Sequence, residues 1–333
     1  MDDFVKQISA VGFEGLDMFD FQVHALSGMF GSVENYQSYL RDHGIAKIVN
    51  LFRGIMYDPP RRRRHVRETH DEIVTSTRRM LGMWDTLDIE SLIVMPASLY
   101  THTAPVTDDK IKAAAECWNR VGEMTLTEFG VRTTCHHEFF CAIRTEEDIR
   151  KFYEWTDPRY VSFFCDTAQH CIAGIDPVAL FMDLHERCSG FHFKDTRQRD
   201  TTEAYRHSPD AELMAPQTAQ WFHEMGTDGG LVDFPRLMRA IRDVGYEAGS
   251  RWSTTRSTSA GGTTPRPPPC PCGTPATSSR RSTHERRHHA RHPSRLRHQP
   301  VEAELRRLHP PRTARARLKV IAACGFTGVE LRG

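Results

Sequence analysis

The sequence has no long apolar segment and no recognisable export signal. Among its 333 residues, no stretch approaches the roughly 18 consecutive apolar residues that a membrane helix requires. The first ten residues, MDDFVKQISA, lack a basic region followed by an apolar core, so no secretory signal is expected. Nine cysteines, an odd number without regular spacing, give no disulfide framework. These absences argue against a membrane protein and predict a cytoplasmic protein with reduced thiols.

Lysine and aspartate nearly disappear after residue 250. Residues 251–333 contain 16 Arg and one Lys against four Glu and no Asp, a net charge of +13, whereas residues 1–250 carry −12. The overall charge of +1 is therefore the average of two unlike segments. The acidic first segment gives no electrostatic reason to bind nucleic acid.

Residues 251–317 lack the apolar periodicity of a folded domain. The segment is rich in Arg, Pro, Ser and Thr and carries the cluster HERRHHARHPSRLRH. Three interpretations fit: a disordered basic tail, a nucleic-acid-binding tail, or a frameshift in a GC-rich gene. Restoring one base near Glu247 permits a reading with an apolar strand, Trp-Val-Ser-Val, followed by Glu-His-Asp and a Gly-rich loop. Because that reading continues the pattern of residues 1–250, the frameshift is favoured.

Short apolar strands alternate with amphipathic helices throughout residues 1–250. We predict strands at Glu14–Phe19, Ala46–Phe52, Ser91–Pro96, Val131–Glu138, Tyr160–Asp166 and Gly190–Asp195. We predict helices at Asp2–Val11, Val33–Asp42, Val66–Leu87, Asp108–Phe129, Glu146–Glu154, Pro177–Glu186 and Phe234–Val244. Thr145 is expected to cap the helix that follows it, and Gly44, Gly130 and Gly245 are expected to end helices in the left-handed conformation. This alternation predicts an α/β fold with a parallel sheet.

Residues 318–333 contain a second copy of a motif from the start of the chain. LKVIAACGFTGVEL, at 318–331, repeats the period and the Gly-Phe-x-Gly turn of VKQISAVGFEGLDM, at 5–18. One repeat is too little for a solenoid. We therefore interpret residues 318–333 as a stray helix–strand unit, and we hypothesise that it is the start of a paralogous reading frame.

Three polar residues stand at or near the carboxyl ends of predicted strands: Glu138, Asp166 and His192. In a parallel αβ barrel these ends form one face, where side chains from separate strands converge. Two carboxylates and an imidazole suit a divalent ion such as Mn²⁺, Co²⁺, Mg²⁺ or Zn²⁺ with positions open to substrate. The alternatives are that Asp166 caps the next turn and that His192 is a hydrogen-bonded core residue.

Four segments, in this order, resemble one protein family. They are GFEGLD (12–17), HHEFFCAIRTEEDI (136–149), DTAQHCIAGIDPVALFMDLHERCSGFHFKDT (166–196) and FHEMGTDGGLVDFPRLMRAIRDVGY (222–246). Together they are similar to the xylose isomerase-like TIM barrels of the sugar phosphate isomerase/epimerase family, which includes inosose dehydratases, inosose isomerases and ketose 3-epimerases. The resemblance covers residues 1–250. It implies an α/β fold of the TIM (β/α)8 type that is incomplete, with the first strand absent and the last missing or out of frame.

The resemblance also implies one divalent metal ion held by four strand-end ligands, Glu, Asp, His and Glu. Glu138, Asp166 and His192 match the first three, and no in-frame residue matches the fourth. Gln169 stands where the more distant endonuclease IV has a histidine for an additional zinc, which argues against DNA repair.

The implied reaction is proton transfer through an enediolate of a sugar, sugar phosphate or cyclitol, with Glu138 as both ligand and acid/base. Loss of a hydroxyl from the same intermediate would make the protein an inosose dehydratase. Lys194 and Asp195 are expected to contact substrate hydroxyls, or equally to form a salt bridge that closes the loop. His136 is expected either to donate to a substrate oxygen or to satisfy the loop around it.

Two further alternatives arise from the last part of the chain. Without a fourth ligand the protein could be an inactive, poorly folded barrel with open sheet edges. With an authentic basic tail it could bind nucleic acid. The favoured interpretation is a metal-dependent isomerase or epimerase whose partner is a small sugar or cyclitol, with neither a membrane nor nucleic acid involved.

Overall fold

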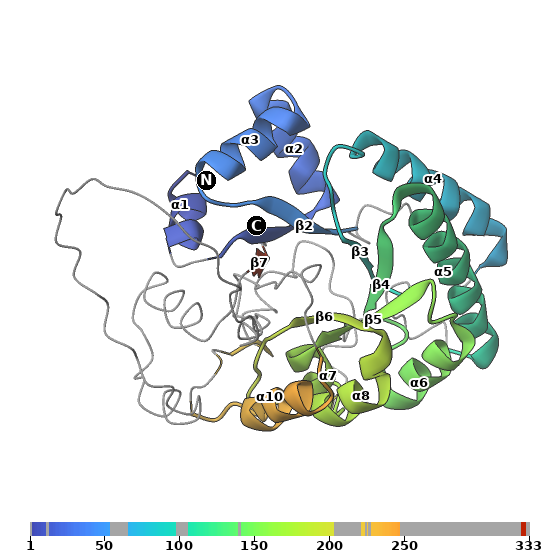
Figure 1. Ribbon diagram of the computed structural model, residues 1–333. Coiled ribbons are helices and arrows are strands. Elements are labelled where there is room, and N and C mark those ends of the chain that lie inside the picture. Colours follow the sequence, from blue (N-terminus) through green and yellow to red (C-terminus); the bar gives the residue numbers. More distant parts are fainter. Residues whose placement is uncertain are drawn as a thin grey trace, which may run out of the picture.

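In the computed structural model, six strands lie side by side in the order in which they occur in the chain (Figure 1). The structure describes residues 2–10, 13–53, 66–97, 106–138, 141–202, 221–223, 225, 228–246 and 328–330. The strands are β1 (Gly15–Phe19), β2 (Lys47–Phe52), β3 (Ser91–Val94), β4 (Arg132–His136), β5 (Val161–Asp166) and β6 (Cys188–His192). A further strand, β7 (Gly328–Glu330), pairs with β1, and all pairings are parallel. The sheet order is therefore β6-β5-β4-β3-β2-β1-β7.

The curved sheet lies inside an arc of helices (Figure 1). These are α1 (Asp2–Ala10), α2 (Asp20–Phe30), α3 (Val33–Asp42), α4 (His70–Met83), α5 (Asp108–Phe129), α6 (Glu146–Trp155), α7 (Thr167–Ile172), α8 (Pro177–Leu184) and α10 (Phe234–Asp243), with short 3-10 helices η2 (Arg67–Thr69) and η3 (His185–Arg187). Six consecutive parallel strands flanked by helices form half of a barrel, so the predicted incomplete TIM-type barrel is confirmed. Within the described residues we find no helix that combines the length and the apolar character of a membrane span.

Apolar side chains pack on both sides of the sheet. Strands β3 and β5 are buried at every residue, as parallel strands covered on both faces should be. The larger apolar cluster joins the strands to the helices and includes Trp118 of α5. A separate small cluster contains Phe52, Ile93 and Phe164, with Phe19 packed against it. Because these side chains come from four strands and form a cluster of their own, we assign them to the inner face of the curved sheet.

The predicted helix ends are confirmed where a specific residue defines them. The Thr145 side chain accepts a hydrogen bond from the Asp148 N–H (3.2 Å) at the start of α6. Gly44, Gly130 and Gly245 have φ angles of +82°, +68° and +59°, the left-handed conformation expected after a helix.

Helices α2 and α7 were not predicted from the sequence. In α2, Phe21 and Met29 are exposed although they are apolar, so the apolar residues do not gather in one stripe and the helical period is weak. Helix α7 has six residues, too few for a periodic signal.

The sixth strand was predicted at Gly190–Asp195 but lies at Cys188–His192. After His192 the backbone leaves the sheet because it makes other hydrogen bonds. The Lys194 N–H donates to Thr167 Oγ1 (2.9 Å), and the Asp195 carbonyl accepts from the His223 N–H (2.7 Å). These contacts end the strand at His192, whereas the alternation of apolar and polar residues alone would extend it to Asp195.

Strand β7 belongs to the repeated motif near the end of the chain. It pairs with β1 so that Gly328 lies opposite Gly15 and Glu330 opposite Asp17, the same positions that the sequence repeat aligns. The basic segment 251–317 and the expected helix before β7 lie outside the described residues, as does the place of the expected fourth ligand. The frameshift and the boundaries of the three segments therefore stay predictions.

Exposed ion pairs connect neighbouring helices around the outside of the half-barrel. Arg78 of α4 pairs with Glu128 of α5 (2.7 Å), and Lys151 of α6 pairs with Asp108 of α5 (2.9 Å). Farther along, α6 is joined to α8 and α8 to α10 by the pairs Arg150–Asp183 and Arg236–Asp176. Each exposed pair contributes little by itself, about 0–1 kcal/mol.

Gly122 allows α5 to approach the segment that precedes β5. A Cβ atom at this position would lie 2.2 Å from the carbonyl oxygen of Tyr160, which belongs to the backbone and cannot rotate away.

We predict that Gly122→Ala lowers the free energy of unfolding by about 1–3 kcal/mol. Gly82→Ala is the matched control, because Gly82 lies in helix α4 with no atom within 4 Å of the new Cβ. In thermal unfolding the control should be unchanged or slightly stabilised; equal behaviour of the two variants would contradict this account.

A buried histidine outside the barrel interior is expected to make the fold sensitive to acid. His170 of α7 lies 5.7 Å from the ring of Phe163 and 6.5 Å from that of His137, and its Nε2 has no hydrogen-bond partner among the described residues. Burial lowers the pKa of His170 to about 4, from 6.5. As the pH falls from 6.5 towards 4, the unfolded chain therefore takes up this proton before the folded one does, and stability is lost.

We predict that His170→Leu removes this contribution. When the pH is lowered from 7 to 4.5, the free energy of unfolding should fall in both proteins. The fall should be smaller in the variant, by on the order of 2 kcal/mol. Urea unfolding at both pH values measures the difference, and His24→Leu, at an exposed histidine of α2, is the control. An identical pH dependence of the two proteins would show that His170 is not the acid-sensitive group.

Candidate metal centre

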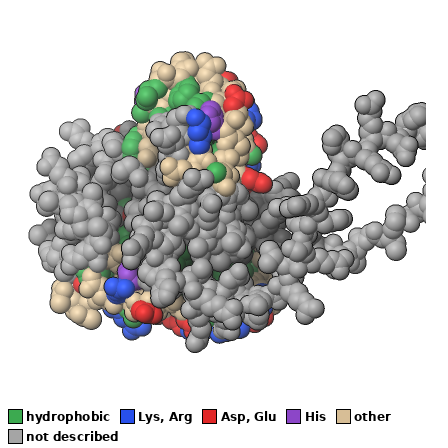
Figure 2. All heavy atoms as spheres, turned by 90° about the vertical axis from the view of Figure 1, so that its left-hand side faces the viewer, with side chains coloured by type: hydrophobic (Ala, Val, Ile, Leu, Met, Phe, Trp, Pro, Cys, Tyr) green, Lys and Arg blue, Asp and Glu red, His purple; other side chains and the backbone are tan. Residues whose placement is uncertain are grey.

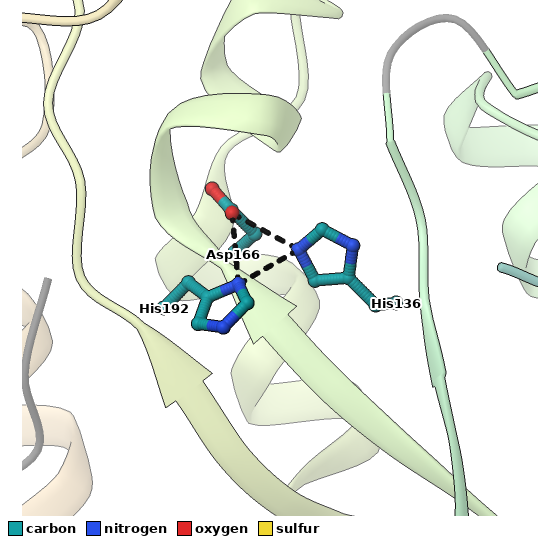
Figure 3. Close-up of side chains that lie close together, drawn as sticks. All are labelled: His136, Asp166 and His192. Atoms are coloured by element: carbon teal, nitrogen blue, oxygen red, sulfur yellow. Dashed lines mark hydrogen bonds and ion pairs between the residues drawn. The ribbon is translucent and has the colours of Figure 1, made fainter. Parts of the chain in front are cut away.

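Three polar side chains come together because each is the last residue of its strand. His136 ends β4, Asp166 ends β5 and His192 ends β6. Asp166 lies opposite His192 in the sheet, whereas His136 lies opposite Phe164, two residues before Asp166. A step of two residues keeps side chains on the same face, so all three point to one place (Figure 3).

The donor atoms of these residues are within contact distance of one another. His136 Nε2 lies 3.0 Å from Asp166 Oδ2 and 2.9 Å from His192 Nδ1, and His192 Nδ1 lies 3.3 Å from Asp166 Oδ2. All three side chains are completely buried. Among the histidine, cysteine and carboxylate side chains of the described residues, these three form a cluster that is arranged to bind a metal ion.

The spacing fits a single small cation. An ion with ligands at about 2.1 Å separates neighbouring ligand atoms by about 3.0 Å in an octahedron and about 3.4 Å in a tetrahedron. The three observed separations span 2.9–3.3 Å. Moreover, two imidazole nitrogens 2.9 Å apart cannot both carry a proton that points at the other, so at least one lone pair faces the centre. These residues therefore fit a divalent metal ion.

Aromatic rings line the side of the centre that faces the barrel interior. The ring of Phe52 lies 5.4 Å from that of His136, edge to face, and the ring of Phe164 lies 4.7 Å from that of His192. Both phenylalanines belong to the small inner cluster. The rings exclude water from this side and strengthen electrostatic interactions at the centre.

The outer surface beside the described elements is chemically mixed. In the view of Figure 2, lysine, arginine and acidic side chains are interspersed on the visible described surface rather than gathered into a patch of one sign.

The buried charges hold the centre in a defined ionisation state. Burial alone would raise the pKa of Asp166, but the Lys194 ammonium and the two histidines outweigh it and hold the pKa well below its ordinary value. Burial would likewise lower the pKa of His136, but the carboxylates of Asp166 and Glu138 outweigh it and raise the pKa. Asp166 is thus an anion to which cations and donors are drawn.

The expected ligand Glu138 lies beside the cluster rather than in it. Its Oε1 is 3.5 Å from Nδ1 of His136, the ring nitrogen that faces away from Asp166. Because Nδ1 forms no hydrogen bond within the described residues, the carboxylate acts on the imidazole through its charge, which raises the His136 pKa. That Glu138 itself contacts a metal or a substrate stays a prediction.

His136 is the member of the cluster that was not in the predicted ligand set, since it was expected to contact substrate or to satisfy the loop around it. The strand was predicted to run to Glu138, but β4 ends at His136. The alternation of strand residues was the available signal, because it directs one of the two adjacent histidines inward. His136 is the inward one. His137 contacts the carbonyl of Ile143 (3.1 Å) and the hydroxyl of Tyr153 (3.1 Å) instead.

Lys194 and Asp195, the other two expected substrate contacts, have different surroundings. Lys194 Nζ lies 2.9 Å from Asp166 Oδ2. The carboxylate of Asp195 accepts hydrogen bonds from the backbone N–H groups of Thr196, Leu231 and Val232 and so fastens the segment that leads to α10. Burial raises the pKa of Asp195 to about 6. Substrate contact by either residue stays a prediction.

Asp166 also performs the capping role that was considered for it. Its Oδ1 accepts a hydrogen bond from the Gln169 N–H (3.0 Å) at the start of α7, while Oδ2 faces the histidines. The two oxygens therefore serve different elements, and the capping and metal-binding interpretations are compatible.

Comparison with known proteins agrees with the fold. An inosose dehydratase from Lacticaseibacillus casei is 28% identical over 154 residues, 46% of this chain and 50% of the relative. The chain thus spans about half the length of the curated relatives it matches. Among solved structures, similar folds are a sugar phosphate isomerase/epimerase from Parabacteroides distasonis (19% identity, TM-score 0.53, 73% of this chain and 77% of that one) and the IolI protein with a bound zinc atom (13%, 0.54, 73% and 79%).

The family resemblance seen in the motifs is confirmed over most of the chain. The profile of one family, described as xylose isomerase-like TIM barrel, matches residues 5–252. These residues include β1 to β6 and all three members of the cluster. The chain therefore belongs to the xylose isomerase-like TIM barrel family.

Proposed function

We propose that this protein binds one divalent metal ion through His136, Asp166 and His192 and acts on a sugar, sugar phosphate or cyclitol as an isomerase or epimerase. The observation that carries the proposal is the spacing of the three buried donor atoms at the ends of β4, β5 and β6. Strand ends of this kind are where TIM barrels place their chemistry.

The donor set favours some metals over others. Two imidazoles and one carboxylate suit Zn²⁺, Mn²⁺ or Co²⁺ better than Mg²⁺, which prefers oxygen ligands alone. The zinc atom bound to the structurally similar IolI protein supports this preference. When bound, such an ion polarises a substrate carbonyl and makes the adjacent C–H more acidic.

The protein's own side chains would then remove and return the proton on the substrate carbon beside the carbonyl. Glu138 is 5% exposed and lies next to the cluster, so its carboxylate can accept the proton from the substrate carbon and return it at a neighbouring position. His136 lies between Glu138 and Asp166, and its contact with Asp166 Oδ2 (3.0 Å) orients the ring. The phenylalanines below the centre keep water from the substrate.

Dehydration of an inosose is the second candidate, favoured by the curated relatives, which are named inosose dehydratases. Both reactions begin with removal of a proton beside a carbonyl. They differ in the second step, because an isomerase returns the proton and a dehydratase releases a hydroxyl. The product distinguishes them: a dehydrated diketone for the dehydratase and an isomer for the isomerase or epimerase.

We predict that Asp166→Asn strongly weakens metal binding. Because the substitution also removes the counter-ion of the buried Lys194, the fold of the variant is checked by circular dichroism before the titration. Asparagine can still accept the hydrogen bond that caps α7, so the variant loses mainly the negative charge at Oδ2. The affinity of the full chain for Zn²⁺ and Mn²⁺, measured by calorimetry, should fall more than about 100-fold, beyond the usual effect of an outer partner. Asp88→Asn, at a side chain that is 92% exposed, should bind like the original protein. Unchanged binding by Asp166→Asn would refute the site.

We predict that the metal-loaded protein exchanges a substrate C–H for deuterium in D₂O, and that Glu138→Gln slows the exchange about 100-fold or more. The assay uses ketoses and inososes and follows deuterium by NMR. Glu14→Gln is the control, because Glu14 is exposed and lies just before the amino end of β1, so the exchange rate should be unchanged. Metal binding without any exchange would instead support the inactive centre expected from a missing fourth carboxylate.

A further inference from the structure

Lys194 is a buried cation in direct contact with the cluster. The side chain is completely buried, and its Nζ lies 2.9 Å from Asp166 Oδ2 and 5.1 Å above the ring of Phe222. Thr167 fixes the backbone at this point, because its Oγ1 accepts from the Lys194 N–H (2.9 Å) and donates to the Lys194 carbonyl (2.5 Å). The ammonium is therefore held at the centre by the local fold.

Asp166 Oδ2 already has three nitrogen neighbours, which leaves little room for a metal ion on the same oxygen. It faces Lys194 Nζ at 2.9 Å, His136 Nε2 at 3.0 Å and His192 Nδ1 at 3.3 Å. The other oxygen, Oδ1, is occupied by the Gln169 N–H. A metal ion placed between the three donor atoms of the cluster would bind Oδ2, and it must therefore share this oxygen or displace one of these groups.

The three neighbours of Oδ2 differ in how they respond to a metal ion. Each imidazole has a ring nitrogen whose lone pair can bind a metal ion, so a histidine can act as a ligand. A lysine ammonium has donors only and offers no lone pair to a metal ion. In this buried, aromatic-lined environment, repulsion between an ammonium and a divalent ion on the same oxygen is weakly screened. Lys194 is therefore the group that a metal ion has to displace.

We propose that Lys194 is the internal counter-ion of the metal-free centre and competes with the metal ion for Asp166 Oδ2. In the metal-free protein it balances the buried carboxylate, and on metal binding it withdraws towards the face of Phe222, where the ring quadrupole still attracts a cation. Lys194 thereby reduces the affinity of the centre for any metal ion that binds Asp166 Oδ2. This inference rests on the proposed metal site.

Lys194→Met tests the competition, because methionine keeps much of the apolar stem and removes the charge. In calorimetric titrations of the full chain with Zn²⁺ and with Mn²⁺, the variant should bind each ion at least about tenfold more tightly than the original protein. Lys47→Met is the matched control. Lys47 is also ion-paired, to Glu90 at 2.8 Å, but lies at the opposite, amino end of β2 and should leave metal affinity unchanged.

A second readout does not depend on affinity. In excess chelator, Lys194→Met should unfold at a lower temperature than the original protein, because Asp166 has lost its counter-ion. Addition of Zn²⁺ should then raise the unfolding temperature of the variant by more than that of the original. If Lys194→Met does not fold, Lys194→Gln is used, which keeps a neutral donor to Oδ2.

The outcomes separate this proposal from the proposed function. Equal or weaker metal binding by the neutral variants, with normal binding by the original protein, overturns the role of Lys194 alone. Lys194→Arg keeps the positive charge and should not gain metal affinity. A gain as large as that of the neutral variants would show that the charge of Lys194 does not compete with the metal ion. If neither the original protein nor any variant binds Zn²⁺ or Mn²⁺, the metal site is wrong and this proposal is wrong with it.

Discussion

The centre of this protein depends on one buried carboxylate. Asp166 has no exposed surface, and an ionised carboxylate in such a place is costly unless donors and cations surround it. The fold meets this requirement with a helix amide on one oxygen and two imidazoles and an ammonium near the other. Because these groups come from three adjacent strand ends and the segments after them, the geometry of β4, β5 and β6 is tied to that single charge.

The stagger of parallel strands explains how these groups meet. His136 lies opposite Phe164 and Asp166 opposite His192, so each strand contributes its last inward residue at a slightly different height. One layer below, phenylalanines fill the inner face, and another layer down Asn50 donates to both oxygens of Asp17. The interior thus alternates between polar and apolar layers, with the candidate chemistry in the layer nearest the loops.

Much of this was predictable from the sequence, and the exceptions have physical causes. Alternating strands and helices predicted the parallel sheet, and the family resemblance predicted that it forms an incomplete barrel. Strand-end position predicted the convergence of Asp166 and His192. Family resemblance placed Glu138 in the ligand set, and that role stays a prediction. The cluster of donor atoms contains His136 instead, because β4 ends two residues earlier than predicted. The pairing of Lys194 with Asp166 was not predictable, because tertiary hydrogen bonds after β6 direct that side chain.

The ion pairs on the outer surface have a consequence for how the chain is made. They join helices that are near one another in the chain, and β2 to β6 each pair with the strand synthesised just before. Each βα unit can therefore dock onto its predecessor as it leaves the ribosome, with only short loops to close. Strand β7 is the exception, because its partner β1 is separated from it by most of the chain. The half-barrel can thus be assembled during translation, whereas the edge beside β1 is covered only after residues 328–330 have been made.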